Sequence, residues 1–90
     1  MSEFGVHCVR QDDGELIVIG RCHRGPLRRG TVSCVVRPAS GGEQPVNLVV
    51  DRIVAYRREP DEIDEGLTAE LRVSGVGGEL IAPQSVLASV

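Results

Sequence analysis

The sequence predicts a small all-β protein, built either as a sandwich or as a closed barrel. Valine alone supplies fourteen of the 90 residues, whereas only two residues are aromatic, and β-branched aliphatic side chains suit pleated strands. Short apolar or alternating segments also recur between glycine-rich turns. No window of eleven or more residues has helical periodicity, apart from one turn within 59–65. The length fits one domain over residues 1–90 with a single modest core.

The first half of the chain contains three predicted strands. Residues 4–10 carry Phe4, Val6 and Cys8 on one parity, and the Asp13-Gly14 pair that follows is a strong hairpin signal. Residues 16–23 are apolar on both faces at first and on one face later, and 24–30 form a turn region with two glycines. Residues 32–36 alternate again, which predicts the third strand.

The second half begins with a polar loop at 38–45 and then continues with strands. Residues 46–56 carry aliphatic side chains on both parities, as in a strand that bends or bulges. Residues 67–74 have the clearest alternation and predict a half-buried strand that ends at a glycine-rich turn. Residues 80–81 and 85–90 predict the last short strand or pair.

Charge is unevenly distributed along the chain. The net charge is −3, every cation is arginine, and there is no lysine. Such a sum argues against a domain whose whole surface is basic. However, residues 1–58 hold nine arginines against six carboxylates, whereas 59–90 hold one against seven. The total therefore hides two oppositely charged segments, and it does not exclude contact with RNA.

Cysteine usage and hydropathy indicate a reduced, cytoplasmic protein. Three cysteines cannot form a complete disulfide framework, and the N-terminus lacks the pattern of a signal peptide. The longest uninterrupted apolar run has four residues, far below the roughly 20 of a membrane span. We expect no membrane association.

The metal-type ligands are few and poorly spaced for zinc. Cys8, Cys22 and Cys34 share parity with core valines, which predicts small packing residues rather than ligands. His7 and His23 each adjoin a cysteine, and adjacent residues on a strand point to opposite faces. The same alternation argues against a Cys-His nucleophile.

Two further segments invite a chemical interpretation. Residues 59–65 carry five carboxylates without the spacing of a calcium loop, and we interpret them as a solvated acidic corner. The glycines at 75–78 follow a strand but precede no helix, so they form a turn and not a dinucleotide site. We therefore expect no catalytic residue, no metal and no cofactor.

One segment resembles a known family. Ile19 to Thr31, IGRCHRGPLRRGT, is similar to the pattern T-G-R-V-E-R-G-x-L/I-K/R-x-G-D/E in the second-domain β-barrel of translational GTPases, among them elongation factors Tu and G. Further matches are Ile53 with Tyr56-Arg57, 63–66, 69–75 and 86–88. The resemblance covers residues 16–88 and implies a closed six-stranded β-barrel like domain 2 of elongation factor Tu, standing alone without the GTPase domain.

The resemblance also implies a non-catalytic binding module that contacts rRNA or tRNA backbone, or a translation-related protein. The implied contact residues are Arg21, Arg24, Arg28, Arg29 and Arg57. Four of these arginines fall within nine residues that contain no carboxylate. The alternative is a protein-interaction or regulatory module that has lost RNA binding, which the negative net charge favours.

Departures from the family pattern narrow these expectations. The family glutamate that meets the terminal adenosine of aminoacyl-tRNA falls on Val54, the family asparagine on Thr68 and the pocket leucine on Arg72. We therefore do not expect aminoacyl-tRNA capture. The chain also has no Gly-x-x-x-x-Gly-Lys-Ser/Thr motif and no lysine, so it cannot hydrolyse GTP by that mechanism.

Overall fold

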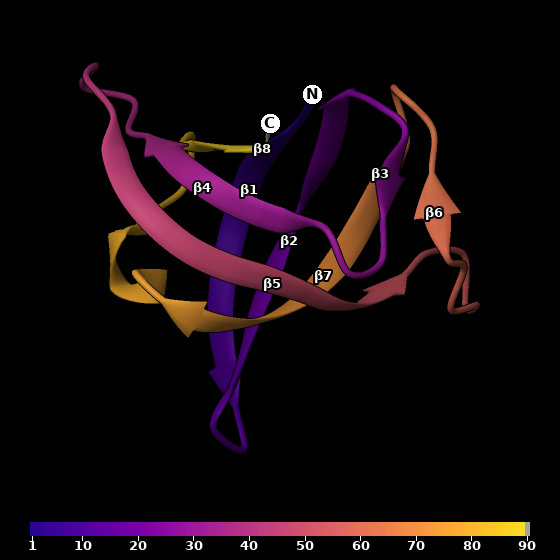
Figure 1. The fold of residues 1–90 in the computed structure, drawn as a ribbon. Coiled ribbons are helices and arrows are strands. Elements are labelled where there is room, and N and C mark those ends of the chain that lie inside the picture. Colours follow the sequence, from indigo (N-terminus) through magenta and orange to yellow (C-terminus); the bar gives the residue numbers. More distant parts are fainter. Residues whose placement is uncertain (90) are drawn as a thin grey trace.

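The computed structural model describes residues 1–89, which form a closed antiparallel barrel with the strand order β1-β2-β7-β5-β4-β8 (Figure 1). The six barrel strands are β1 (Ser2–Asp12), β2 (Glu15–Arg24), β4 (Val32–Arg37), β5 (Gln44–Val54), β7 (Thr68–Val76) and β8 (Val86–Ser89). The prediction of an all-β protein with a closed six-stranded barrel is confirmed. Among the described residues, no helix is long and apolar enough to cross a membrane.

Two short strands pair outside the barrel. β3 (Leu27–Arg28) and β6 (Glu62–Ile63) form a separate two-stranded antiparallel sheet, on the right-hand side of Figure 1. Leu27 and Ile63 are directly opposite one another in this sheet and belong to the buried core cluster. Both segments are thus anchored by an apolar side chain, and their charged neighbours are left at the surface.

The barrel interior is filled by one inward-facing set of aliphatic side chains. Phe4, Val18, Leu48, Ile53 and Leu71 are each at most 1% exposed and belong to one cluster. They alternate with outward-facing residues along their strands, as the period of a pleated strand requires. Because Phe4 is the only aromatic residue in this interior, the core consists almost entirely of aliphatic packing.

β1 and β2 approach one another unusually closely at two glycines. A Cβ atom added at Gly20 would lie 1.9 Å from the carbonyl oxygen of Gly5 and 2.9 Å from the ring of Phe4. The pairing register of β1 and β2 also shifts between Val6 and Cys8. Glycine is therefore needed at position 20 because no side chain fits between the two strands.

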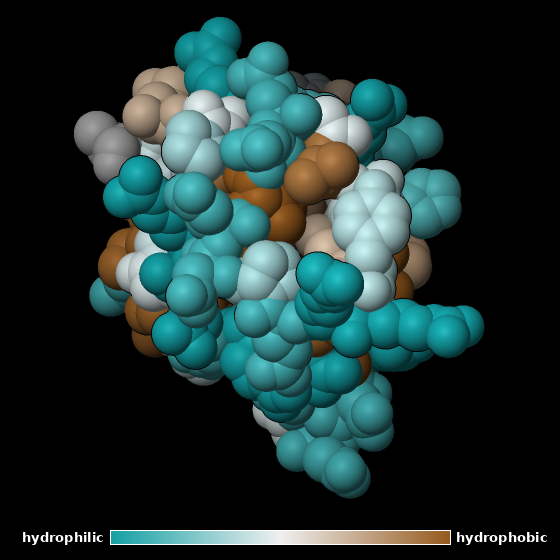
Figure 2. Space-filling view, turned by 90° about the vertical axis from the view of Figure 1, so that its right-hand side faces the viewer, coloured by the Kyte–Doolittle hydropathy of each residue, from teal (hydrophilic) through white to brown (hydrophobic). Residues whose placement is uncertain are grey.

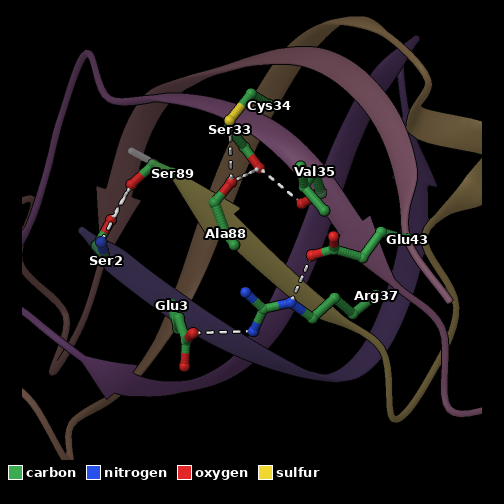
Figure 3. Close-up of polar contacts among 9 residues, drawn as sticks. All are labelled: Ser2, Glu3, Ser33, Cys34, Val35, Arg37, Glu43, Ala88 and Ser89. Atoms are coloured by element: carbon green, nitrogen blue, oxygen red, sulfur yellow. Dashed lines mark hydrogen bonds and ion pairs between the residues drawn. The ribbon is translucent and has the colours of Figure 1, made fainter. Parts of the chain in front are cut away.

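The barrel closes where β8 lies between β1 and β4 (Figure 3). Ser2 and Ser89 are both buried, and their hydroxyl groups are hydrogen-bonded. The Ser33 hydroxyl donates to the Ala88 carbonyl at 3.0 Å. Beside this seam the guanidinium of Arg37 binds the carboxylates of Glu3 on β1, at 2.9 Å, and of Glu43, at 3.0 Å. The hydrogen bond from Arg37 lowers the pKa of Glu3.

Some local predictions differ from the structure. Residues 80–81 were expected to be a strand, but Gly78–Leu80 form the 3-10 turn η1. The turn region 24–30 contains β3, and 59–65 contains β6 instead of a helical turn. Cys22 lies in the core as predicted, whereas Cys8 and Cys34 are only partly buried. A strand of two residues cannot be recognised from side-chain alternation, because two residues are too few to repeat a pattern.

Candidate functional site

The predicted contact arginines of β2 and β3 lie along one rim of the molecule. We call Arg21, Arg24, Arg28 and Arg29 the arginine rim. Arg21 and Arg24 lie on β2, Arg28 lies on β3 and Arg29 follows it. All four side chains are exposed. Figure 2 shows the side of the molecule that carries β3, β6 and the end of β5, where hydrophilic residues predominate and hydrophobic ones form only small patches.

The acidic corner packs against this rim through its backbone. Gly66 N donates to the Cys22 carbonyl at 2.7 Å, and Cys22 N donates to the Leu67 carbonyl at 2.9 Å. Arg29 N donates to the Asp61 carbonyl at 2.7 Å. The Arg21 guanidinium also donates from Nε to the Gly66 carbonyl at 2.9 Å. Residues 61–67 therefore run alongside 21–29, although the two segments are far apart in the sequence.

Two of the rim arginines form ion pairs with this corner. Arg28 Nε lies 3.0 Å from Glu62 Oε2, and Arg29 Nη2 lies 3.1 Å from Asp61 Oδ1. All four side chains are about half exposed or more, and solvent-exposed pairs of this kind contribute about 0–1 kcal/mol. The pairs therefore lower the positive potential of the rim but do not lock the two arginines in place.

The two oppositely charged segments of the sequence are interleaved in the fold. Five ion pairs join residues of 1–58 to residues of 59–90 within the described part of the chain: Arg10–Glu70, Arg28–Glu62, Arg29–Asp61, Arg52–Glu59 and Arg72–Glu15. The uneven distribution along the sequence is therefore largely evened out in space. The positive potential is therefore strongest at the arginines that remain unpaired and weaker at Arg28 and Arg29.

Among residues 1–89, the side chains of Arg24, Arg57 and Arg58 form no hydrogen bond or ion pair. Arg57, the fifth predicted contact residue, is separated in sequence from the rim and lies in a tight turn after β5. The same turn holds Arg58 and the exposed Tyr56, neither of which was a predicted site residue. The signal for Tyr56 was its rarity: it is one of only two aromatic residues, and two arginines follow it directly.

A cleft of about 470 Å³ lies next to Arg21. It is formed by β1, β2, the start of β7 and the loop before β8, and its lining includes Gly5, Arg21, His23, Thr68 and Gln84. The imidazole of His23 packs against Gly5, where an added Cβ would come within 2.3 Å of the ring. The lining of the cleft thus combines the His23 ring, packed over Gly5, with the cationic side chain of Arg21.

On the neighbouring outer face, an ion-pair network covers an apolar residue. Arg72 donates to Glu15 at 2.9 Å and to Glu70 at 3.2 Å, and Arg10 donates to Glu70 at 3.3 Å. Ile17 pairs in register with Arg10 on one side and Arg72 on the other, and it is fully buried although it lies outside the core cluster. The two arginines and their carboxylates therefore shield Ile17 from solvent.

The cysteine and histidine side chains do not form a metal site. Within the described residues, no three or more His, Cys, Asp or Glu side chains lie close enough together to hold an ion. Burial raises the pKa of the Cys22 thiol, so this group stays protonated near neutral pH. A protonated, buried thiol is a poor nucleophile.

Comparison with solved structures identifies the fold. The translation elongation factor SelB from Methanococcus maripaludis, in its apo form, matches 98% of this chain with a TM-score of 0.79 and 18% sequence identity. This chain has the fold of a translation-factor barrel. It covers 18% of the SelB chain. No protein-family model and no curated protein matches the sequence. The barrel therefore resembles domain 2 of elongation factor Tu in architecture, as the sequence motifs predicted.

Proposed function

We propose that this barrel is a cytoplasmic, non-catalytic binding module of the translation apparatus that contacts the phosphate backbone of rRNA or tRNA. The contact residues are Arg21, Arg24, Arg28, Arg29 and Arg57. The observation that carries the proposal is the exposure of all five arginines on a barrel whose architecture matches part of a translation elongation factor. Exposed guanidinium groups suit phosphate oxygens, and such contacts supply affinity without reading sequence.

The structure also supports a second candidate, a protein-binding module. Arg28 and Arg29 already pair with Glu62 and Asp61, so part of the rim presents mixed charge. A surface with both signs in alternation complements another protein better than it complements a uniformly negative RNA backbone. This candidate keeps the barrel and the rim but changes the class of partner.

A titration with labelled ribosomal RNA fragments at low salt tests the proposal. Arg24→Glu reverses an unpaired cation of the rim, and the Arg28→Glu/Arg29→Glu double variant reverses the paired ones. The matched control is Arg10→Glu, which makes the same charge change on an exposed arginine of β1 away from the rim. We expect the rim variants to weaken binding and to reduce the salt dependence by about one counterion per lost phosphate contact.

The titration and a fractionation of native lysate decide between the candidates. Loss of affinity in the rim variants but not in Arg10→Glu supports RNA contact. Undetectable binding at low salt, or equal binding by all variants, refutes it. In lysates of the native host, sedimentation with ribosomes supports the first candidate, and association with one dominant protein in a ribosome-free fraction supports the second.

A further inference from the structure

A tight turn at the end of β5 holds one of the chain's two aromatic residues in solvent. Ala55 and Arg58 exchange backbone hydrogen bonds, each with an N···O distance of 2.9 Å, and enclose Tyr56 and Arg57. We call residues 55–58 the β5 hairpin tip. Tyr56 is 74% exposed, whereas the other aromatic residue, Phe4, is 1% exposed. The only tyrosine of the chain thus makes no contribution to the core.

The backbone of this tip is unfavourable for the residues it contains. Tyr56 and Arg57 have φ values of 53° and 62°, the left-handed values that a type I′ turn requires at both central positions. The hairpin between β1 and β2 meets the same requirement with Asp13 and Gly14, at 51° and 78°. A turn of this type favours Asn-Gly or Asp-Gly, so its geometry does not explain a tyrosine followed by an arginine. Strained and exposed positions of this kind cluster at binding sites.

The tip also holds two of the three unpaired arginines within residues 1–89. The other seven arginines each donate a hydrogen bond to a carboxylate or a carbonyl, or form an ion pair with a carboxylate: Arg10, Arg21, Arg28, Arg29, Arg37, Arg52 and Arg72. Glu59, the nearest carboxylate along the chain, is bound by Arg52. Arg57 and Arg58 therefore retain their full hydrogen-bonding capacity beside the tyrosine ring.

An exposed aromatic ring that is followed along the chain by two arginines with no bound carboxylate matches the chemistry of single-stranded RNA. Every base offers a flat face that stacks on an aromatic ring, and the flanking phosphates accept hydrogen bonds from arginine. A duplex does not offer this contact, because its bases are already stacked on one another. A contact of this kind distinguishes unpaired from paired RNA.

The surroundings of Tyr56 favour RNA over a protein partner. A tyrosine at the centre of a protein interface is normally ringed by contacts that exclude water. Near the tip, Asp51, Arg52 and Glu59 are exposed and charged. The exposed aliphatic residues Val32 and Val76 lie beside an earlier part of β5. Val32 pairs with Val49, seven residues before Tyr56, and Val76 pairs with Asn47, nine residues before it. No apolar ring therefore surrounds the tyrosine in the described part of the chain.

We infer that the β5 hairpin tip binds an unpaired nucleotide of a single-stranded RNA segment. The base stacks on the Tyr56 ring, and the adjacent phosphates are held by Arg57 and Arg58. The inference rests on the proposed function in taking RNA as the partner. It adds Tyr56 and Arg58 to the contact surface and a preference for unpaired RNA that the rim alone does not provide.

The test uses the full chain and two labelled RNAs, a short single strand without internal pairing and a duplex of the same length. Tyr56→Ala is expected to lower affinity for the single strand by roughly tenfold and to leave duplex binding unchanged. Tyr56→Phe retains the stacking face and is expected to bind like the wild type. Because the chain has one tyrosine and no tryptophan, quenching of its intrinsic fluorescence reports stacking directly.

A second variant separates binding from folding. Tyr56→Asn/Arg57→Gly gives the turn its preferred residues, and we expect it to unfold at a higher denaturant concentration while losing single-strand affinity. Equal single-strand binding by the wild type and Tyr56→Ala overturns the tip as a binding site. If Arg24→Glu still weakens binding in that case, the proposed function stands. If the wild type binds neither RNA, both proposals fail. If a purified protein binds the chain and this binding is lost in Tyr56→Ala, the choice of RNA as the partner is overturned.

Discussion

Arg28 and Glu62 are opposite each other in the β3–β6 ladder, and the Arg28 guanidinium donates to the Glu62 carboxylate at 3.0 Å. Arg28 of the arginine rim is therefore held against the acidic corner in two ways, by the pairing of β3 with β6 and by the hydrogen bond of its side chain. The contact surface depends on how strong this pairing is, since a weakly held arginine is free to exchange its carboxylate for a phosphate.

The coupling energy of this pair is expected to be small. Both side chains are about half exposed or more, so a double-mutant cycle of Arg28→Ala and Glu62→Ala should give a coupling of about 0.2–1 kcal/mol. Urea unfolding of the wild type, both single variants and the double variant measures it. A coupling well above that range would mean that Arg28 is held by Glu62 and does not reach RNA.

Removing the carboxylates of the corner is expected to strengthen RNA binding. Asp61→Asn/Glu62→Gln leaves the size of both side chains unchanged but frees Arg29 and Arg28. Affinity for RNA should rise by roughly tenfold at low salt, with a steeper salt dependence. The control is Glu79→Gln on η1, an exposed carboxylate with no ion pair among the described residues. An equal gain in the control would indicate a general charge effect and not release of the rim.

The strain of the β5 hairpin tip should be measurable as lost stability. Tyr56→Asn/Arg57→Gly places turn-forming residues where φ is 53° and 62°, which should stabilise the fold by about 1–2 kcal/mol. Chemical denaturation gives this value, and the same exchange in an unstrained loop should give no gain. A loss of stability would show that Tyr56 packs usefully in the folded state.

Replacement of Gly20, the glycine of β2, is expected to destabilise the fold strongly. The added methyl group of Gly20→Ala would collide with the Gly5 carbonyl at 1.9 Å, and the two strands must then separate. We expect a cost of about 3 kcal/mol. The matched control is Gly41→Ala, where no atom lies within 4 Å of the new methyl group and φ is +95°, with a cost of about 1 kcal/mol. Similar losses in both variants would argue against the close approach.

The contact between Glu3 and Arg37 should make stability depend on pH. The hydrogen bond from Arg37 lowers the pKa of Glu3 below its usual value of 4.5. A carboxyl with a lowered folded-state pKa stabilises the fold above its unfolded-state pKa, and this contribution is lost as the pH falls through the folded-state pKa. Stability should therefore decline below about pH 4.5, and Glu3→Gln should weaken this decline. An unchanged pH profile in Glu3→Gln would assign the decline to other carboxyls.

The barrel could be predicted from the sequence because its long strands repeat. Buried side chains alternate with more exposed ones over residues 68–74 of β7, and the Asp13-Gly14 pair marks the first hairpin by composition alone. The segment 46–56 is also predicted as a strand that bends or bulges, and the register of β5 does shift between Val50 and Arg52. Local patterns such as these can be recognised in the sequence because each involves only residues that are close together along the chain.

The arrangement of the candidate site could not be predicted in the same way. The pairing of Arg28 with Glu62 joins two strands of two residues that are 34 positions apart, and no periodicity encodes such a contact. The sequence predicts the arginines as contact residues and the acidic corner as a separate solvated segment, whereas the structure brings the two side by side. The predicted contact residues include Arg57 but not Tyr56. The exposed Tyr56 ring belongs to a left-handed turn after β5, and the segment has no Gly, Asn or Asp that would mark such a turn in the sequence.

The hydroxyl contact of Ser2 with Ser89 brings the two ends of the described chain to one point on the barrel seam (Figure 3). A host protein could therefore accept this barrel within a single surface loop by using two short linkers, since little distance separates entry from exit. In Figure 1 the ends lie at the top, whereas β5 runs out to the right-hand side. A barrel grafted in this way should keep its hairpin tip outside the junction, so that the RNA-binding test can be repeated on an unrelated carrier.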